Sequence, residues 1–223
     1  MGGEVRLAAA AEGHDVVGVI GPDGDRNSRG IAEAVAALAP DAAIEFTTPQ
    51  SGEDNVTALV QARLPTVSGT TGWDPATVCS LADRLRTPLM VAPNFSVGAV
   101  VLAQLVRRAA DMLRAFSDYQ PAIIERHHKL KRDAPSGTAR MLADQIRAGG
   151  RGSDVPIGSV RQGGQPGEHT IYFEGSDECL TLSHQVRSRR TFALGAVRAA
   201  CWLATEQPGR SVTFESFLER MRQ

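Results

Sequence analysis

The sequence predicts an α/β protein in two parts: first a parallel sheet flanked by helices, then an α+β part whose sheet is mainly antiparallel. Three observations lead to this prediction. Short apolar runs alternate with helical segments between residues 42 and 96, the pattern of a parallel sheet. Turn sequences follow those runs, as at Gly69-Thr70-Thr71-Gly72. Alternating segments without helices between them occupy residues 157–186, which favours antiparallel strands.

Composition and charge narrow the possible functions. The chain has 223 residues, of which 42% are hydrophobic and 22% charged, as in globular proteins with a buried core. Its net charge of -1 gives no basis for a nucleic-acid or membrane partner. The three cysteines are far apart, so we expect neither a disulfide framework nor a metal site. No apolar run is long enough to span a bilayer, and we expect a cytoplasmic protein.

The elements of the first part follow in order. Residues 1–11 are expected to form a helix, and the apolar run 16–20 a buried strand. Strands and helices should then alternate as strand 43–46, helix 53–62, strand 65–68, helix 75–85 behind an Asp74 cap, and strand 88–91. In such sheets ligands bind at the carboxyl ends of the strands, where the turns 69–72 and 92–95 are expected to lie.

The second part begins with a long amphipathic helix. Its apolar face is expected to carry Val101, Leu105, Ala109 and Leu113 within residues 97–116. A strand at 122–124 precedes a helix that has Ser136 as its N-cap. The remaining expected elements are a flexible turn at 149–153, antiparallel strands at 157–161, 169–173 and 179–186, a helix at 192–204, and a strand and helix within 212–221.

Between the strand at 122–124 and the Ser136 helix lies a basic stretch, residues 125–139. It contains two adjacent histidines, His127 and His128, with Lys129, Lys131 and Arg132 behind them. A histidine can exchange a proton near neutral pH, and a lysine can bind a carboxylate. The amides at the helix start add partial positive charge. These features favour a site for a small anionic substrate; the alternative is a solvated basic loop before an ordinary helix cap.

The same stretch, read as His-His-x-x-Lys-x-Asp-Ala-Pro-Ser-Gly-Thr-Ala, resembles the active-site signature of the dihydrodipicolinate reductase family. The resemblance implies a Rossmann-like dinucleotide-binding domain made of residues 1–96 and 190–223. Residues 97–189 would form the substrate-binding and tetramerisation domain. The implied enzyme is an oxidoreductase of lysine and diaminopimelate biosynthesis. It reduces a cyclic dicarboxylate, 4-hydroxy-tetrahydrodipicolinate, to tetrahydrodipicolinate with NADH or NADPH and loss of water, and it forms a homotetramer.

The resemblance also assigns roles to residues. His127 is the implied proton donor, and Lys131 the cation that binds a carboxylate or protonates the ring. The implied substrate contacts are His128, Ser136, Gly137, Thr138 and Arg189. The implied cofactor contacts are Met1, Gly2, Gly69, Thr70, Thr71, Ala92, Pro93, Asn94 and Phe95. Segments 47–49, 165–170 and 188–192 resemble the family as well, so the likeness extends along nearly the whole chain.

Two departures from the family pattern lie near the start. Met1-Gly2 resembles the end of the glycine-rich loop, and the strand that should precede that loop is absent. Gly21-Pro22 stands where an acidic residue should hold the adenine ribose, with Asp23, Asp25, Arg26 and Arg29 nearby, so NADH and NADPH both remain open. A shortened chain or a wrongly assigned start codon explains the first departure. The alternatives are a homologue that binds or dehydrates the dicarboxylate without redox chemistry, and a binding protein that keeps only the fold.

Overall fold

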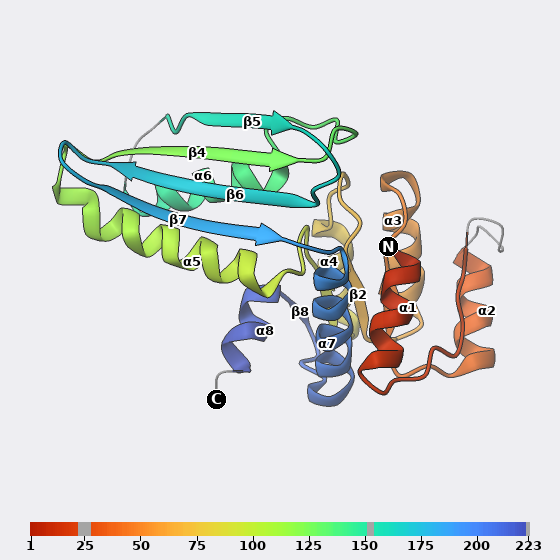
Figure 1. The fold of residues 1–223 in the computed structure, drawn as a ribbon. Coiled ribbons are helices and arrows are strands. Elements are labelled where there is room, and N and C mark those ends of the chain that lie inside the picture. The colour runs from red at the N-terminus through yellow and green to blue at the C-terminus, as the bar shows by residue number, and fades with distance from the viewer. Residues whose placement is uncertain (22–27, 151–153, 222–223) are drawn as a thin grey trace. The chain divides into compact units, whose positions relative to one another are not determined.

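The computed structural model of the protein describes residues 1–21, 28–150 and 154–221. The chain divides into two compact units (Figure 1). Unit 1 comprises Met1–Phe95 and Arg190–Gln223, and unit 2 comprises Ser96–Arg189. Because the last helices return to unit 1, that unit is discontinuous in sequence.

Unit 1 is built on a four-stranded parallel sheet. The strands, in spatial order, are β1 (Ala43–Glu45), β2 (Thr66–Ser68), β3 (Leu89–Val91) and β8 (Ser211–Val212). The helices are α1 (Gly2–Ala11), α2 (Ser28–Leu38), α3 (Pro49–Gln61), α4 (Ala76–Leu85), α7 (Arg190–Glu206) and α8 (Phe214–Arg220). Strands that alternate with helices confirm the predicted α/β class of this part.

Small residues let helices approach closely in unit 1. Helix α1 packs on α7 through Ala8 and Ala9, which contact Ala193 and Val197. Valines of α3 and α4 form a second cluster with Leu89 of β3. These clusters fix the sheet beneath the turns that follow β1, β2 and β3.

The expectation of a strand near the beginning of the chain is wrong, and one helix there was not predicted. Residues 16–20 do not form a strand, and Val17 and Val19 are exposed. An apolar run becomes a strand only when a neighbouring strand accepts its hydrogen bonds, and none of the strands in the described ranges pairs with this one. Helix α2, whose side chains are described from Gly30 onward, was not expected; it packs against α3 through Ile31, beside Leu59.

Unit 2 contains a four-stranded mixed sheet in the order β5-β4-β6-β7. The strands are β4 (Gln120–His127), β5 (Ile157–Arg161), β6 (Gly167–Glu174) and β7 (Cys179–Val186). The β4–β6 and β6–β7 pairs are antiparallel, which confirms the mainly antiparallel sheet. Strand β5 is a correction, because it pairs with β4 in parallel. Helix α6 connects these two strands, as a parallel crossover requires.

Helices α5 (Val97–Met112) and α6 (Gly137–Ala148) cover one face of this sheet, and a short 3₁₀ helix, η1 (Leu113–Ala115), follows α5. Their shared core contains Val106, Leu142 and Ile146 of the helices together with Ile123 and Phe173 of the strands. No helix in the described ranges carries a stretch apolar and long enough to cross a membrane.

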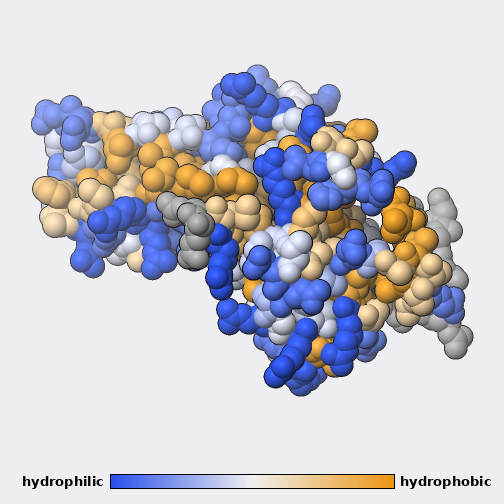
Figure 2. Space-filling view, turned by 90° about the horizontal axis from the view of Figure 1, so that it is seen from below, coloured by the Kyte–Doolittle hydropathy of each residue, from blue (hydrophilic) through white to orange (hydrophobic). Residues whose placement is uncertain are grey.

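The predicted apolar face of α5 was partly wrong. Val101 and Leu105 are 46% and 52% exposed, whereas Leu102 and Val106 are buried against the sheet. Figure 2, which views the molecule from the α5 side, shows apolar side chains as a band on this surface. The helix has apolar residues on more than one side, so its spacing alone does not decide which side meets the core.

Candidate active site

His127 is the last residue of β4. This is a correction, because the sequence had predicted that His127 lies in a loop after the strand. On β4 the residues Ile123, Glu125 and His127 alternate with exposed ones and are buried on the helix-covered face. The register of the neighbouring strands decides which residues lie beside Glu125 and His127. Glu125 pairs with Ser159 of β5 and His169 of β6, while Arg161 of β5 pairs with His127.

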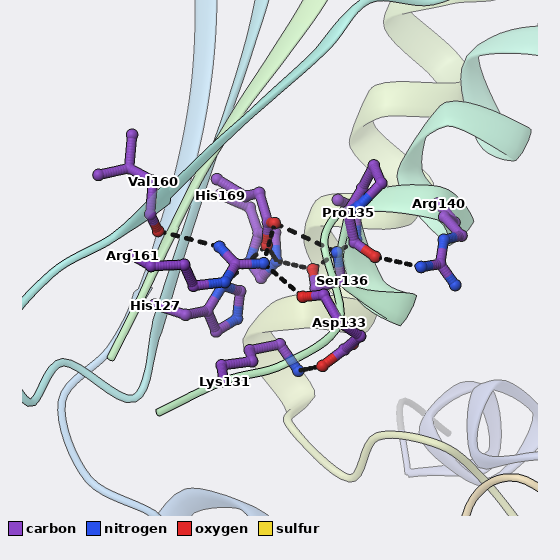
Figure 3. A network of polar contacts seen from close by, with 11 residues as sticks. His127, Lys131, Asp133, Pro135, Ser136, Arg140, Val160, Arg161 and His169 are labelled. Carbon is purple, nitrogen blue, oxygen red and sulfur yellow. Dashed lines mark hydrogen bonds and ion pairs between the residues drawn. The ribbon is translucent and has the colours of Figure 1, made fainter. Parts of the chain in front are cut away.

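A cluster of polar side chains surrounds the carboxylate of Glu125 (Figure 3). Its Oε1 accepts hydrogen bonds from Nη2 of Arg161 at 2.6 Å and from the backbone N–H of Ser136 at 3.2 Å. Its Oε2 lies 2.7 Å from Nδ1 of His127 and 4.0 Å from Nε2 of His169. The contact with His127 does not meet the geometry of a well-aligned hydrogen bond, and it becomes an ion pair when the imidazole is protonated.

Ser136 connects this cluster to the start of helix α6, and its predicted role as N-cap is confirmed. Its Oγ accepts a hydrogen bond from the backbone N–H of Ala139 at 3.2 Å. The same Oγ lies 3.2 Å from Nε2 of His169. Because Oγ already accepts from the helix, its own proton is free to be donated to His169.

The electrostatics of the cluster keep a charge on Glu125. Burial favours its neutral form, but hydrogen bonds from Ser136, Ser159 and Arg161 and the charge of His127 outweigh that effect and lower the pKa of Glu125 to about 2. Burial lowers the pKa of His127, and Glu125 opposes this shift. Burial and the neighbouring His127 lower the pKa of His169 to about 4. The carboxylate is therefore ionised at neutral pH, with two imidazoles beside it.

The other predicted substrate-site residues lie in the chain between β4 and the first turn of helix α6, with one exception. The ammonium group of Lys131 lies 2.8 Å from Oδ1 of Asp133, whose backbone carbonyl accepts from Arg161 at 2.6 Å. His128 directly follows β4 and is half-buried. Gly137 and Thr138 open helix α6, next to Ser136. The structure thus brings Lys131 and the helix start near His127.

Arg189 is the exception among the predicted substrate contacts. It lies in the exposed turn after β7 and is the last residue of unit 2 in the sequence. It is not part of the Glu125 cluster.

Glu125, His127 and His169 also offer one donor atom each within 4.8 Å of one another, as in some metal sites. Two features oppose a metal ion here. Arg161 already donates to Glu125 and balances its charge. The 2.7 Å between Nδ1 of His127 and Oε2 of Glu125 is shorter than the separation of about 3.3 Å between two tetrahedral zinc ligands. The geometry therefore favours an ion-pair network.

Seven of the nine predicted cofactor contacts of unit 1 directly follow two parallel strands. Gly69, Thr70 and Thr71 come directly after β2, and 92–95 directly after β3. Met1 and Gly2 lie at the start of α1, with Met1 as its N-cap. Of the other nucleotide-site residues considered, Asp23, Asp25 and Arg26 lie outside the described residues, as does the side chain of Arg29.

A buried carboxylate, Glu45, joins the turns after β1 and β2. It accepts hydrogen bonds from the hydroxyls of Ser68 at 2.5 Å and Thr70 at 2.8 Å, and from the backbone N–H and the hydroxyl of Thr47. The Thr70 hydroxyl also accepts from the Thr47 N–H at 2.8 Å. Because this hydroxyl already donates its one proton to Glu45, a hydrogen bond donated by Thr70 to a cofactor would come from its backbone.

Phe95 also points into the protein. Its ring packs edge-on against Phe46 at 6.0 Å and Phe214 at 5.1 Å between centroids. Gly195 of α7 approaches so closely that a Cβ there would lie 1.9 Å from the carbonyl oxygen of Phe95. The side chain of Phe95 is therefore a core group, and only its backbone is placed for a ligand contact.

Sequence reasoning assigned no role to Glu125, Arg161, His169 or Glu45. For Glu125 a signal existed, because it stands two residues before His127 and such residues share one face of a strand. Arg161 and His169 join the cluster only through the register of β5 and β6, which the sequence pattern does not give.

Sequence models of the dihydrodipicolinate reductase family match both parts of the chain. The model of the family's N-terminus matches residues 2–95, and that of its C-terminus residues 98–218. Curated relatives named 4-hydroxy-tetrahydrodipicolinate reductase include one from Archaeoglobus fulgidus, 36% identical over 85% of this chain and 80% of the relative. Another, from Xanthomonas campestris, is 39% identical over 92% of this chain and 87% of the relative.

Solved structures agree with this assignment. The dipicolinate-bound dihydrodipicolinate reductase from Paenisporosarcina sp. TG-14 is similar with a TM-score of 0.65 and 28% identity, over 82% of this chain and 76% of that one. A probable dehydrogenase from Thermotoga maritima shares the fold, with a TM-score of 0.58 and 9% identity over 96% of this chain and 88% of that one. The family models, the relatives and the fold lead to one conclusion: the chain belongs to the dihydrodipicolinate reductase family.

Proposed function

We propose that this protein is a 4-hydroxy-tetrahydrodipicolinate reductase of lysine and diaminopimelate biosynthesis. The observation that carries the proposal is the cluster at the end of β4: a buried histidine, an ionised carboxylate behind it, a lysine and a helix start lie together in unit 2. The family match supports the same activity, because relatives covering most of this chain carry that name.

The proposed reaction converts 4-hydroxy-tetrahydrodipicolinate, NAD(P)H and a proton to tetrahydrodipicolinate, NAD(P)+ and water. Bound NADH or NADPH supplies the hydride. His127 donates the proton that the reduced ring requires, and Lys131 binds a carboxylate or protonates the ring. The backbone N–H groups of Gly137 and Thr138 would bind the second carboxylate of the substrate, because they lie at the start of helix α6, where an anion is stabilised. His128 and Arg189 are the further substrate contacts of this proposal.

Unit 1 is the proposed cofactor domain, and unit 2 the proposed substrate-binding and tetramerisation domain. The fit of the cofactor rests on the turns after β2 and β3, because ligands of parallel sheets bind beyond the carboxyl ends of the strands. Glu45 fixes the first of these turns in shape. The choice between NADH and NADPH is tested by comparing kcat/KM for the two. Both units match the family, and no comparison favours the alternative without redox chemistry.

The assembly proposed from the family resemblance is a cytoplasmic homotetramer that forms through the sheet of unit 2. The face of this sheet opposite α5 and α6 exposes Ile124 and Val160, which supports an interface there. Light scattering coupled to size exclusion measures the mass directly. Ile124→Lys should dissociate the tetramer if this face is the contact, whereas Leu105→Lys on α5 should not. A monomeric mass for the unmodified protein would contradict the proposed assembly.

The reductase activity is tested by following oxidation of NADH and of NADPH in the presence of the freshly generated substrate. We expect His127→Ala to lower kcat by about two to four orders of magnitude with a smaller change in KM, as for a general acid. The exposed His14, in unit 1, provides the matched control His14→Ala. A kcat for His127→Ala within a few-fold of the unmodified protein would remove His127 from the proposed role.

A further inference from the structure

Glu125 is a buried charged residue to which the proposed reaction gives no role. Its side chain is 0% exposed, and its pKa lies well below that of an ordinary glutamate. Arg161 and the Ser136 N–H occupy Oε1, while no well-aligned hydrogen bond from the described residues reaches Oε2. A buried carboxylate oxygen in this state is costly unless another charge faces it. Of the two imidazoles beside Oε2, His127 lies closer, at 2.7 Å against 4.0 Å for His169.

The backbone fixes the relation between the two side chains. Glu125 and His127 are two residues apart on β4, so both project from the same face of the strand. The edge of the imidazole that carries Nδ1 lies against Oε2 at 2.7 Å. The ring of His169 packs edge-on at 5.1 Å between centroids, and Gly167 leaves room for the other edge, since a Cβ there would lie 2.9 Å from Nε2. The ring therefore has one orientation, with Nδ1 toward the carboxylate.

We propose that Glu125 is a positioning residue for His127, whose carboxylate holds a proton on Nδ1 and so directs Nε2 to the substrate. The proposal rests on the proposed function of His127 as proton donor. In the transfer step the Nε2–H bond breaks and its proton goes to the substrate. The ring that remains is neutral and keeps the Nδ1 proton beside Glu125. Solvent then returns a proton to Nε2.

The surrounding charges make Glu125 important for the charged form of His127. The groups that act on His127 are Glu125 of its own strand, Arg161 of β5, His169 of β6, and Lys131 and Asp133 of the following loop. Burial lowers the pKa of His127, and so do Lys131 and Arg161. Glu125 is the strongest influence that raises this pKa, with Asp133 adding to it. Without the carboxylate, the imidazolium that donates the proton should exist only at lower pH.

The test substitutes Glu125→Gln, which keeps the shape of the side chain and removes its charge. The matched control is Glu174→Gln, an exposed residue at the opposite end of β6 from Gly167. Two readouts are combined: the pH dependence of kcat, and the NMR titration of the His127 ring protons. With five histidines in the chain, comparison with His127→Gln identifies the signal. The NMR readout needs no turnover, so it tests the Glu125–His127 coupling even if the proposed reductase activity is absent.

We expect Glu125→Gln to shift the His127 midpoint about one to three pH units lower, the effect of removing an opposite charge at this range. The kcat at neutral pH should fall about tenfold to a thousandfold, with KM for the dicarboxylate within about threefold. Glu174→Gln should leave the His127 midpoint unchanged. A midpoint for Glu125→Gln within about 0.3 units of the unmodified protein would overturn the proposal.

Glu125→Asp keeps the charge and withdraws the carboxylate by one methylene. It provides the test if Glu125→Gln does not fold, as judged by circular dichroism. We expect the His127 midpoint to stay within about half a unit while kcat falls about tenfold, because the ring loses its fixed orientation. An Asp variant with unchanged kcat would show that the position of the carboxylate has no effect, and the proposal would be wrong.

Discussion

His169 should make unit 2 sensitive to mild acid. The folded protein holds this buried imidazole neutral, with a pKa of about 4, while an unfolded histidine has the ordinary value of 6.5. As pH falls below 6.5, the unfolded chain takes up a proton that the folded chain does not. The stability present above pH 6.5 is therefore lost progressively until pH reaches about 4. The difference of 6.5 − 4 units, at about 1.36 kcal/mol each, amounts to about 3 kcal/mol.

The perturbation is His169→Gln, which cannot titrate and can still accept the Ser136 hydroxyl. Urea unfolding at about pH 7.5 and about pH 4.5 gives the free energy of unfolding in each case. We expect the unmodified protein to lose about 2.5 kcal/mol more than the variant between these conditions, because pH 4.5 still lies above the folded pKa and part of the total is not yet lost. His14→Gln, which removes an exposed histidine of unit 1, is the control and should resemble the unmodified protein.

The choice of probe matters because the chain has two units. Both tryptophans, Trp73 and Trp202, lie in unit 1, whereas both tyrosines, Tyr119 and Tyr172, lie in unit 2. Hydrogen exchange of β4 and β6 peptides, together with tyrosine signals, therefore reports unit 2. If the unmodified protein and His169→Gln lose equal stability over this pH range, His169 is not held neutral and our account of the cluster is wrong.

Three further predictions concern other contacts. Lys131→Ala should raise KM for the dicarboxylate and lower kcat, because it removes a cation beside the site. Steady-state kinetics of the control variant Lys129→Ala, at an exposed lysine, should be unchanged. Equal kinetics for both variants would exclude Lys131 from the site. Ser136→Ala should lower the free energy of unfolding by about 2–4 kcal/mol, since it loses a helix cap and leaves His169 without its partner. Urea titration should show only about 1 kcal/mol for Thr213→Ala, which loses a cap alone; similar losses would contradict the His169 contribution. Glu45→Gln should raise KM for NADH or NADPH several-fold, because the turn after β2 loses a charge-assisted bond of about 1.5–3 kcal/mol; an unchanged KM would separate this turn from cofactor binding.

Much of the architecture follows from local sequence signals. Turn and cap residues act within a few positions of themselves, so the Ser136 cap and the strands before residues 69 and 92 could be placed correctly. Apolar runs indicate burial, but they do not say which partner supplies hydrogen bonds. For that reason residues 16–20 were wrongly expected to be a strand, and β4 was expected to end before His127.

The signature around His127 indicated the family and the candidate proton donor from sequence alone, because all its residues lie within one stretch of chain. The environment of that histidine depends on tertiary structure. Register places Ser159 and His169 on either side of Glu125, and Arg161 beside His127, although β5 and β6 lie more than thirty residues away in sequence. Side-chain periodicity is the same for every even shift of register, so only the folded sheet decides which charges meet the carboxylate.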